Sequence, residues 1–113
     1  GAMDKVAQYQ KFIQQLILEY SHNDPVEEGV ETQIVFDTER HHYFWMNIGW
    51  NGTRRVYYSI VHFDIKDGKI WIQENLTEAD PAEDLVNLGV PKDDIVLGLQ
   101  PPYKRPYTDY GVA

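Results

Sequence analysis

His62 and Asp64 are the residues whose types and spacing best fit acid–base chemistry. Two positions apart on an extended strand, they point to the same face with Cβ atoms about 7 Å apart, from where an imidazole and a carboxylate can approach each other. Such a pair is more often a surface or buried hydrogen-bonded pair, and no nucleophile motif such as GxSxG accompanies it. We therefore expect no catalytic residue, and keep a small enzyme using His62 and Asp64 as an alternative.

The histidines do not predict a metal site. His41 and His42 are consecutive, so on a strand their side chains point to opposite faces, while His22 and His62 lie in unrelated elements. There is no cysteine, which removes thiolate zinc sites and cysteine nucleophiles. Neither G-x-G-x-x-G nor G-x-x-x-x-G-K occurs. The sequence thus predicts no metal site and no cofactor.

The first element that must support these residues is an N-terminal helix. Asp4 is expected to cap it, and its apolar stripe runs to about His22. Asn23-Asp24-Pro25 ends it, because the residue before a proline is disfavoured in the helical region. The apolar side chains recur at spacings of three and four: Val6, Tyr9, Ile13, Leu16, Ile17 and Tyr20.

β-Branched and aromatic residues then predict an antiparallel meander. The tight turns are expected at Asn51-Gly52 and Asp67-Gly68, which supply the positive φ that such turns prefer. The expected strands span about 32–37, 42–50, 54–66 and 69–75.

The turn at Asp67-Gly68 fixes a register for the last two strands. It pairs Lys66 with Lys69, Ile65 with Ile70, Asp64 with Trp71, Phe63 with Ile72 and His62 with Gln73. One face, expected to be core, carries Val61, Phe63, Ile65, Ile70 and Ile72. The other carries His62, Asp64, Trp71 and Gln73. We expect Trp71 to be either an interface anchor or a core side chain, covered by the tail with Tyr103 and Tyr107 or by another part of the fold.

The C-terminal third predicts two short helices and a tail. Asp80-Pro81-Ala82-Glu83 has the form of an N-cap, a first-turn proline and a capping-box acid, and Gly89 ends that helix. Pro91 starts another short turn, with Asp93 and Asp94 near its positive end. The proline-rich tail should be extended. The expected fold class is α+β: an N-terminal helix packed on an antiparallel β-meander of about four strands, followed by two short helices and an extended C-terminal tail.

Length and charge narrow the function classes. The 113 residues predict one domain over 4–113, with Gly1-Ala2 as an expression scar. A mean hydropathy of −0.51, the lack of a long apolar run and the absence of cysteine favour a cytoplasmic protein. The net charge of −8 opposes direct nucleic-acid binding. The basic pairs Arg54-Arg55 and Lys104-Arg105 are expected to be exposed turn residues.

Several segments together closely resemble the XisI-type proteins of cyanobacteria, the fdxN element excision controlling factors. They span more than half of the chain in the order found in the family. They are Gly49-Trp50 followed by Arg54 or Arg55, "HFDIKDGKIWIQ" from His62 to Gln73, Thr77-Glu78, "GVPKDDIVLG" from Gly89 to Gly98, and the terminal "RPYTDYGVA".

The resemblance implies a small α+β controlling factor for DNA rearrangement during heterocyst differentiation, encoded beside a XisH-type protein that resembles endonucleases. We expect a non-enzymatic accessory role through contacts with that XisH-type partner. A direct DNA-binding dimer is kept as an alternative, and a homodimer is left open. The candidate partner-binding residues are His62, Asp64, Trp71, Gln73, Trp50, Arg54, Arg105 and Tyr107.

Overall fold

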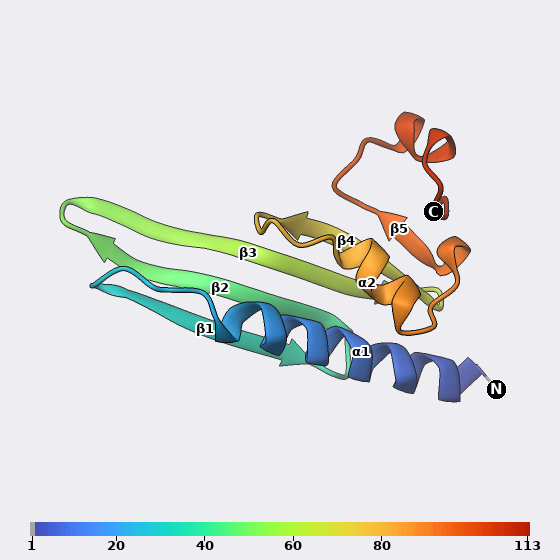
Figure 1. Cartoon of the computed structure of the whole chain (residues 1–113), viewed down its shortest axis with the longest axis horizontal. Coiled ribbons are helices and arrows are strands. Elements are labelled where there is room, and N and C mark those ends of the chain that lie inside the picture. Colours follow the sequence, from blue (N-terminus) through green and yellow to red (C-terminus); the bar gives the residue numbers. More distant parts are fainter. Residues whose placement is uncertain (1) are drawn as a thin grey trace.

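The chain folds as a five-stranded sheet with helices on one face, which confirms the predicted α+β class (Figure 1). The computed structural model describes residues 2–113, with side chains from Lys5 onward. The sheet order is β1-β2-β3-β4-β5. The elements are α1 (Ala2–His22), β1 (Val30–Asp37), β2 (His42–Asn51), β3 (Arg54–Lys66), β4 (Lys69–Asn75), α2 (Pro81–Asn87), the 3₁₀ turn η1 (Lys92–Asp94), β5 (Ile95–Leu97) and the 3₁₀ helix η2 (Pro102–Tyr107).

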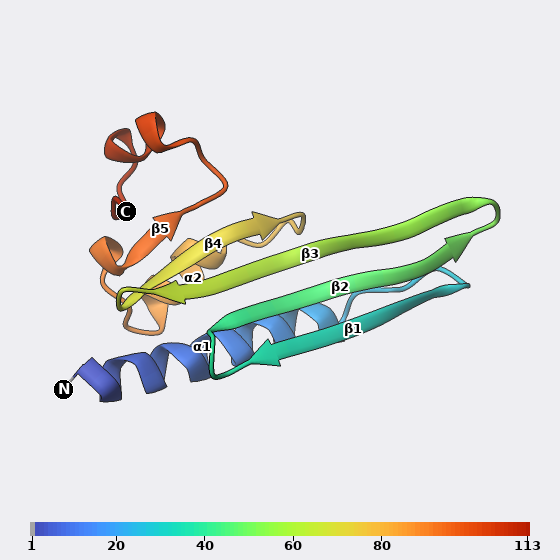
Figure 2. The same cartoon turned by 180° about the vertical axis from the view of Figure 1, so that it is seen from behind.

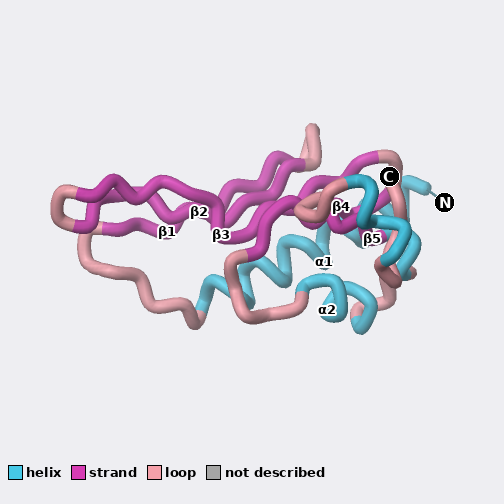
Figure 3. Tube along the Cα trace, turned by 90° about the horizontal axis from the view of Figure 1, so that it is seen from above, coloured by secondary structure: helices cyan, strands magenta, loops and turns pink. Residues whose placement is uncertain are grey.

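The helices α1 and α2 lie on the same side of the sheet (Figure 3). The opposite side, which we call the uncovered face, carries neither of them (Figure 2). α1 begins at Ala2, so Asp4 lies inside it and does not precede it as a cap; the Asp4 side chain lies outside the described part. No helix in the described part of the chain is long and apolar enough to span a membrane.

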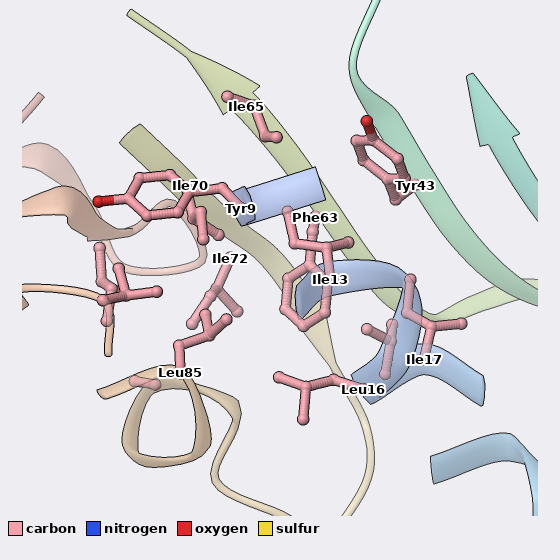
Figure 4. Close-up of a cluster of buried hydrophobic side chains, with 14 of the residues drawn as sticks. Tyr9, Ile13, Leu16, Ile17, Tyr43, Phe63, Ile65, Ile70, Ile72 and Leu85 are labelled. Carbon is pink, nitrogen blue, oxygen red and sulfur yellow. The ribbon is translucent and has the colours of Figure 1, made fainter. Parts of the chain in front are cut away.

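The core lies between the helices and the sheet (Figure 4). The apolar stripe of α1 supplies Tyr9, Ile13, Leu16 and Ile17, and α2 supplies Leu85. The predicted core face of β3 and β4 is confirmed, since all five of its side chains are buried: Val61, Phe63, Ile65, Ile70 and Ile72. Period-two alternation on these strands therefore leaves the intervening side chains on the uncovered face.

The predicted register of β3 and β4 is confirmed for four of its five pairs. His62 pairs with Glu74, not Gln73, because the register shifts between His62 and Phe63. Such a shift adds an extra residue to one strand, and that residue is Gln73. Its side chain stays on the uncovered face, where its Nε2 donates to Asp64 Oδ2 at 3.1 Å.

The β2–β3 hairpin differs from the prediction at two places. Asn51 pairs with Arg54, so the turn is centred on Gly52-Thr53, one residue later than expected, and Gly52 takes the positive φ of 62°. The register also shifts between Trp45 and Met46, where Ile60 is the extra residue of β3. Beyond that bulge His42 lies directly opposite Asp64.

The C-terminal part adds a strand that the sequence did not predict. β5 pairs in parallel with β4, and its Ile95 and Val96 are fully buried. Val96 also forms a parallel bridge with Gly111, so the end of the chain adds to this edge. The expected extended tail is wrong over Pro102–Tyr107, which is 3₁₀ helix, because the fixed φ of proline also fits a 3₁₀ turn.

The start of α2 is as predicted: Asp80 caps it by accepting from the Glu83 backbone N–H at 3.1 Å, and Pro81 occupies the first turn. The short turn after Pro91 is also present. Asp94 also makes side-chain contacts with α1. Its Oδ2 accepts from the Tyr9 hydroxyl at 2.5 Å and pairs with Lys5 Nζ at 3.0 Å, which ties α1 to the C-terminal part.

Candidate functional site

The predicted pair of His62 and Asp64 is formed, and a second histidine joins it. His62 Nε2 lies 2.7 Å from Asp64 Oδ1, and His42 Nδ1 lies 2.8 Å from the same oxygen. The cross-strand pairing of β2 with β3 places His42 opposite Asp64, and His62 lies two residues earlier on the Asp64 face. Two imidazoles therefore converge on one carboxylate oxygen of the uncovered face.

Asp64 is a buried carboxylate, with 7% of the residue exposed. Burial alone raises a carboxyl pKa, yet the hydrogen bonds from His42, His62 and Gln73 outweigh it and hold the pKa of Asp64 below its ordinary value. Asp64 is therefore ionised at neutral pH. Its oxygens accept hydrogen bonds there and do not donate a proton.

Neighbouring side chains fix this group in place. The Phe44 ring stacks on His62 with centroids 3.9 Å apart and an interplanar angle of 24°. Gln73 holds the second Asp64 oxygen. Gly98 leaves space for Gln73, because a Cβ added at that position would clash with Gln73 Oε1. We call His42, His62, Asp64 and Gln73 the histidine–aspartate cluster.

Trp71 is half-buried next to this cluster, and two cations contact its ring. Lys66 Nζ is 4.1 Å from the ring centroid, and the Arg105 guanidinium carbon is 5.1 Å from it. Arg105 also donates to the carbonyls of Leu97, Gln100 and Gly98, at 3.3, 3.1 and 3.5 Å. The tail thus reaches Trp71 through Arg105.

The two tail tyrosines proposed to cover Trp71 are themselves largely exposed. Tyr103 is 70% exposed and Tyr107 is 90% exposed. A guanidinium held by three backbone carbonyls is better placed for this contact, because its planar group both donates in the plane and stacks on an aromatic face.

Trp50 and Arg54 lie apart from the cluster, near the β2–β3 turn. Trp50 is 54% exposed, and the Arg55 guanidinium lies over both its ring and that of Tyr57, at 5.4 and 5.6 Å. Arg54 lies on the helix side, at a cavity of about 550 Å³ that Trp45 and Tyr58 also line. Trp50 therefore shares the uncovered face with the cluster, whereas Arg54 lies on the other side of the sheet.

His42 is the residue that the sequence analysis missed. The signal for it was the pairing of the two long strands, which places His42 opposite Asp64 only after the shift at Ile60. The cluster offers an acid–base pair, and the ligand atoms of His42, His62 and Asp64 all lie within 4.8 Å of one another. Two imidazoles and a carboxylate are also a set of donors that can hold a metal ion.

The comparisons with known proteins point to one family. The model of the family described as XisI protein matches residues 3–112. The crystal structure of a XisI-like protein from Anabaena variabilis ATCC 29413 is 57% identical with a TM-score of 0.91, covering 96% of this chain and 99% of that one. The fdxN element excision controlling factor XisI from the same organism is 33% identical with a TM-score of 0.88, at the same coverage. No curated protein sequence matches. The chain belongs to the XisI protein family.

Proposed function

We propose that this chain is a non-enzymatic controlling factor in the excision of a DNA element. In this proposal it acts by binding a XisH-type, endonuclease-like partner protein. The observation that carries the proposal is the family membership, together with the name of the 33% identical relative as an fdxN element excision controlling factor. In this proposal the recombination chemistry belongs to a separate recombinase.

The uncovered face is the surface we assign to the partner. Cross-strand pairing and alternation place a row of partly or fully exposed apolar side chains there: Val35, Phe44, Met46, Ile48, Trp50 and Tyr57. An apolar sheet face without a covering layer is typical of a protein interaction site. Trp50 and Tyr57 are large rings of the kind that anchor interfaces.

The charge of the chain supports a basic partner. Eighteen acids against ten lysines and arginines give the net charge of −8. An endonuclease-like partner needs a basic groove for its substrate, since phosphates are bound largely by lysine and arginine. We propose that acids of this chain mask that groove. Trp71 is a second anchor in this proposal, and His62, Asp64, Gln73, Arg105 and Tyr107 remain predicted contact residues. Arg54 lies on the opposite, helix side of the sheet and is outside the surface assigned to the partner.

Titration of the XisH-type partner with purified chain variants tests the proposal. Trp50→Ala should weaken the complex by about 2 kcal/mol or more, about thirtyfold, because it removes an anchor ring. The thermal midpoint of the Trp50→Ala chain should stay near that of the wild type, because the ring is more than half exposed. Leu18→Ala is the matched control, since Leu18 is similarly exposed but lies on α1, behind the sheet.

Two results would overturn the proposal. One is equal partner affinity of wild type, Trp50→Ala and Tyr57→Ala. The other is a turnover activity of the purified chain that Asp64→Asn abolishes while the fold stays intact, which favours the enzyme alternative.

A further inference from the structure

We propose that His42, His62 and Asp64 form a binding site for one divalent transition-metal ion of the Zn²⁺ class. The ligand atoms are His42 Nδ1, His62 Nε2 and Asp64 Oδ1, which all lie within 4.8 Å of one another. This site does not depend on the proposed partner contact.

The spacing of the ligand atoms is close to what a metal needs. The two nitrogen–oxygen distances are 2.8 and 2.7 Å. A tetrahedral zinc with bonds of about 2.0–2.2 Å separates its ligand atoms by about 3.3–3.5 Å. Each histidine therefore has to retreat from Asp64 by only about half an ångström. The side chain of His42 is 47% exposed and has room for this movement.

The charge around Asp64 also favours a cation. Asp64 is buried, and its hydrogen-bond partners are two imidazoles and the Gln73 amide. Within the described side chains, no lysine or arginine forms an ion pair with Asp64. Lys66 on the same strand places its Nζ over the Trp71 ring instead. A bound dication supplies the fixed positive charge that this buried carboxylate otherwise lacks.

The donor types select the class of metal. Imidazole nitrogen suits Zn²⁺, Co²⁺, Ni²⁺ and Fe²⁺, whereas Mg²⁺ and Ca²⁺ prefer shells made of oxygen. Three protein ligands leave a coordination position for water. Neighbouring side chains also orient the ligands. Gln73 donates to the second oxygen of Asp64, and Phe44 stacks on the ring of His62. Such support is a regular feature of metal sites.

Calorimetric titration of the tag-free full chain with Zn²⁺ tests the site. The wild type should bind one equivalent, and His42→Ala should lower the affinity by about tenfold or more, because even loss of a group supporting a ligand commonly costs that much. His22→Ala is the matched control, since His22 is an exposed histidine at the far end of α1. Titration with Mg²⁺ should give no binding.

A second measurement separates a metal site from a hydrogen-bonded cluster. Addition of Co²⁺ should give visible ligand-field absorption bands in the wild type and in His22→Ala, and these bands should be lost in His42→Ala and Asp64→Asn. Gln73→Ala keeps all three ligands and should bind with intermediate affinity. Circular dichroism checks that each variant is folded. Equal Zn²⁺ affinity of wild type and His42→Ala, or no saturable binding by the wild type, would overturn the proposal.

Discussion

His42 and Asp64 lie directly opposite each other on β2 and β3, with Nδ1 and Oδ1 2.8 Å apart. The extra residue Ile60 produces this relationship. If the pairing continued from the turn at Gly52-Thr53 without that extra residue, His42 would lie opposite Phe63. The same continuation would place His41 opposite Asp64, so a single β-bulge decides that His42, and not His41, faces the carboxylate.

Asp64→Asn should remove a pH-dependent part of the stability. The pKa of Asp64 is lowered from 3.8 in the folded chain, so its contribution is complete above 3.8 and is lost as the pH falls from there through the folded-state pKa. Urea unfolding at a series of pH values checks this: the difference between wild type and Asp64→Asn should shrink in that acid range. Asp67→Asn is the control, because Asp67 is exposed in a left-handed turn that asparagine also adopts. A constant difference down to the lowest pH would contradict the prediction.

Tyr9→Phe should lower the free energy of unfolding by about 1–2 kcal/mol, because the Tyr9 hydroxyl donates to Asp94 from a buried ring. Phenylalanine keeps the packing of the ring and removes only this donor. Chemical denaturation measures the change, and Tyr103→Phe, at an exposed tyrosine, should leave the stability unaltered. An unchanged midpoint in Tyr9→Phe would show that the hydrogen bond from Tyr9 to Asp94 contributes nothing.

Arg105→Ala should destabilise the chain by about 1–3 kcal/mol, since three carbonyls lose a charged donor and Trp71 loses one of its two cations. Thermal melting detects the loss. Lys104→Ala is the neighbouring control, because Lys104 is exposed and its Nζ lies over the exposed ring of Tyr103. Equal melting of the two variants would argue against a stabilising role for Arg105.

The purified chain should bind duplex DNA no better than an unrelated acidic protein at physiological salt. Ten lysines and arginines against eighteen acids leave too little positive charge to release counterions from phosphates. Fluorescence anisotropy with labelled duplex at two salt concentrations measures this. Submicromolar affinity that falls steeply with salt would instead support the DNA-binding dimer.

The parts of the fold that were predictable rest on local signals. Asp67-Gly68 sets the turn and hence the register from Lys66 to Phe63, and Asp80-Pro81 marks the start of α2. β5 was not predictable in this way, because three residues are too short to show a period and their parallel pairing depends on distant parts of the chain.

The candidate site was predictable only within one hairpin. The approach of His62, Asp64 and Gln73 follows from alternation on β3 and β4. The arrival of His42 depends on the turn at Gly52-Thr53, which Asn51-Gly52 indicated only to within one residue, and on the bulge at Ile60, which has no distinct signal in the sequence. The same holds for Arg105, whose carbonyl partners are set by how the tail folds.

The β2–β3 hairpin extends past the end of β4, which pairs with β3 only from Val61 onward (Figure 1). Residues 54–59 of β3 therefore have a strand neighbour on one side alone. Backbone amides there should exchange with deuterated water through local opening, while those of Phe63 and Ile65, inside the core, exchange only when the whole chain unfolds. The boundary between fast and slow amide exchange should fall at Ile60. The bulge then separates a part of the sheet that opens locally from a part that opens only on global unfolding.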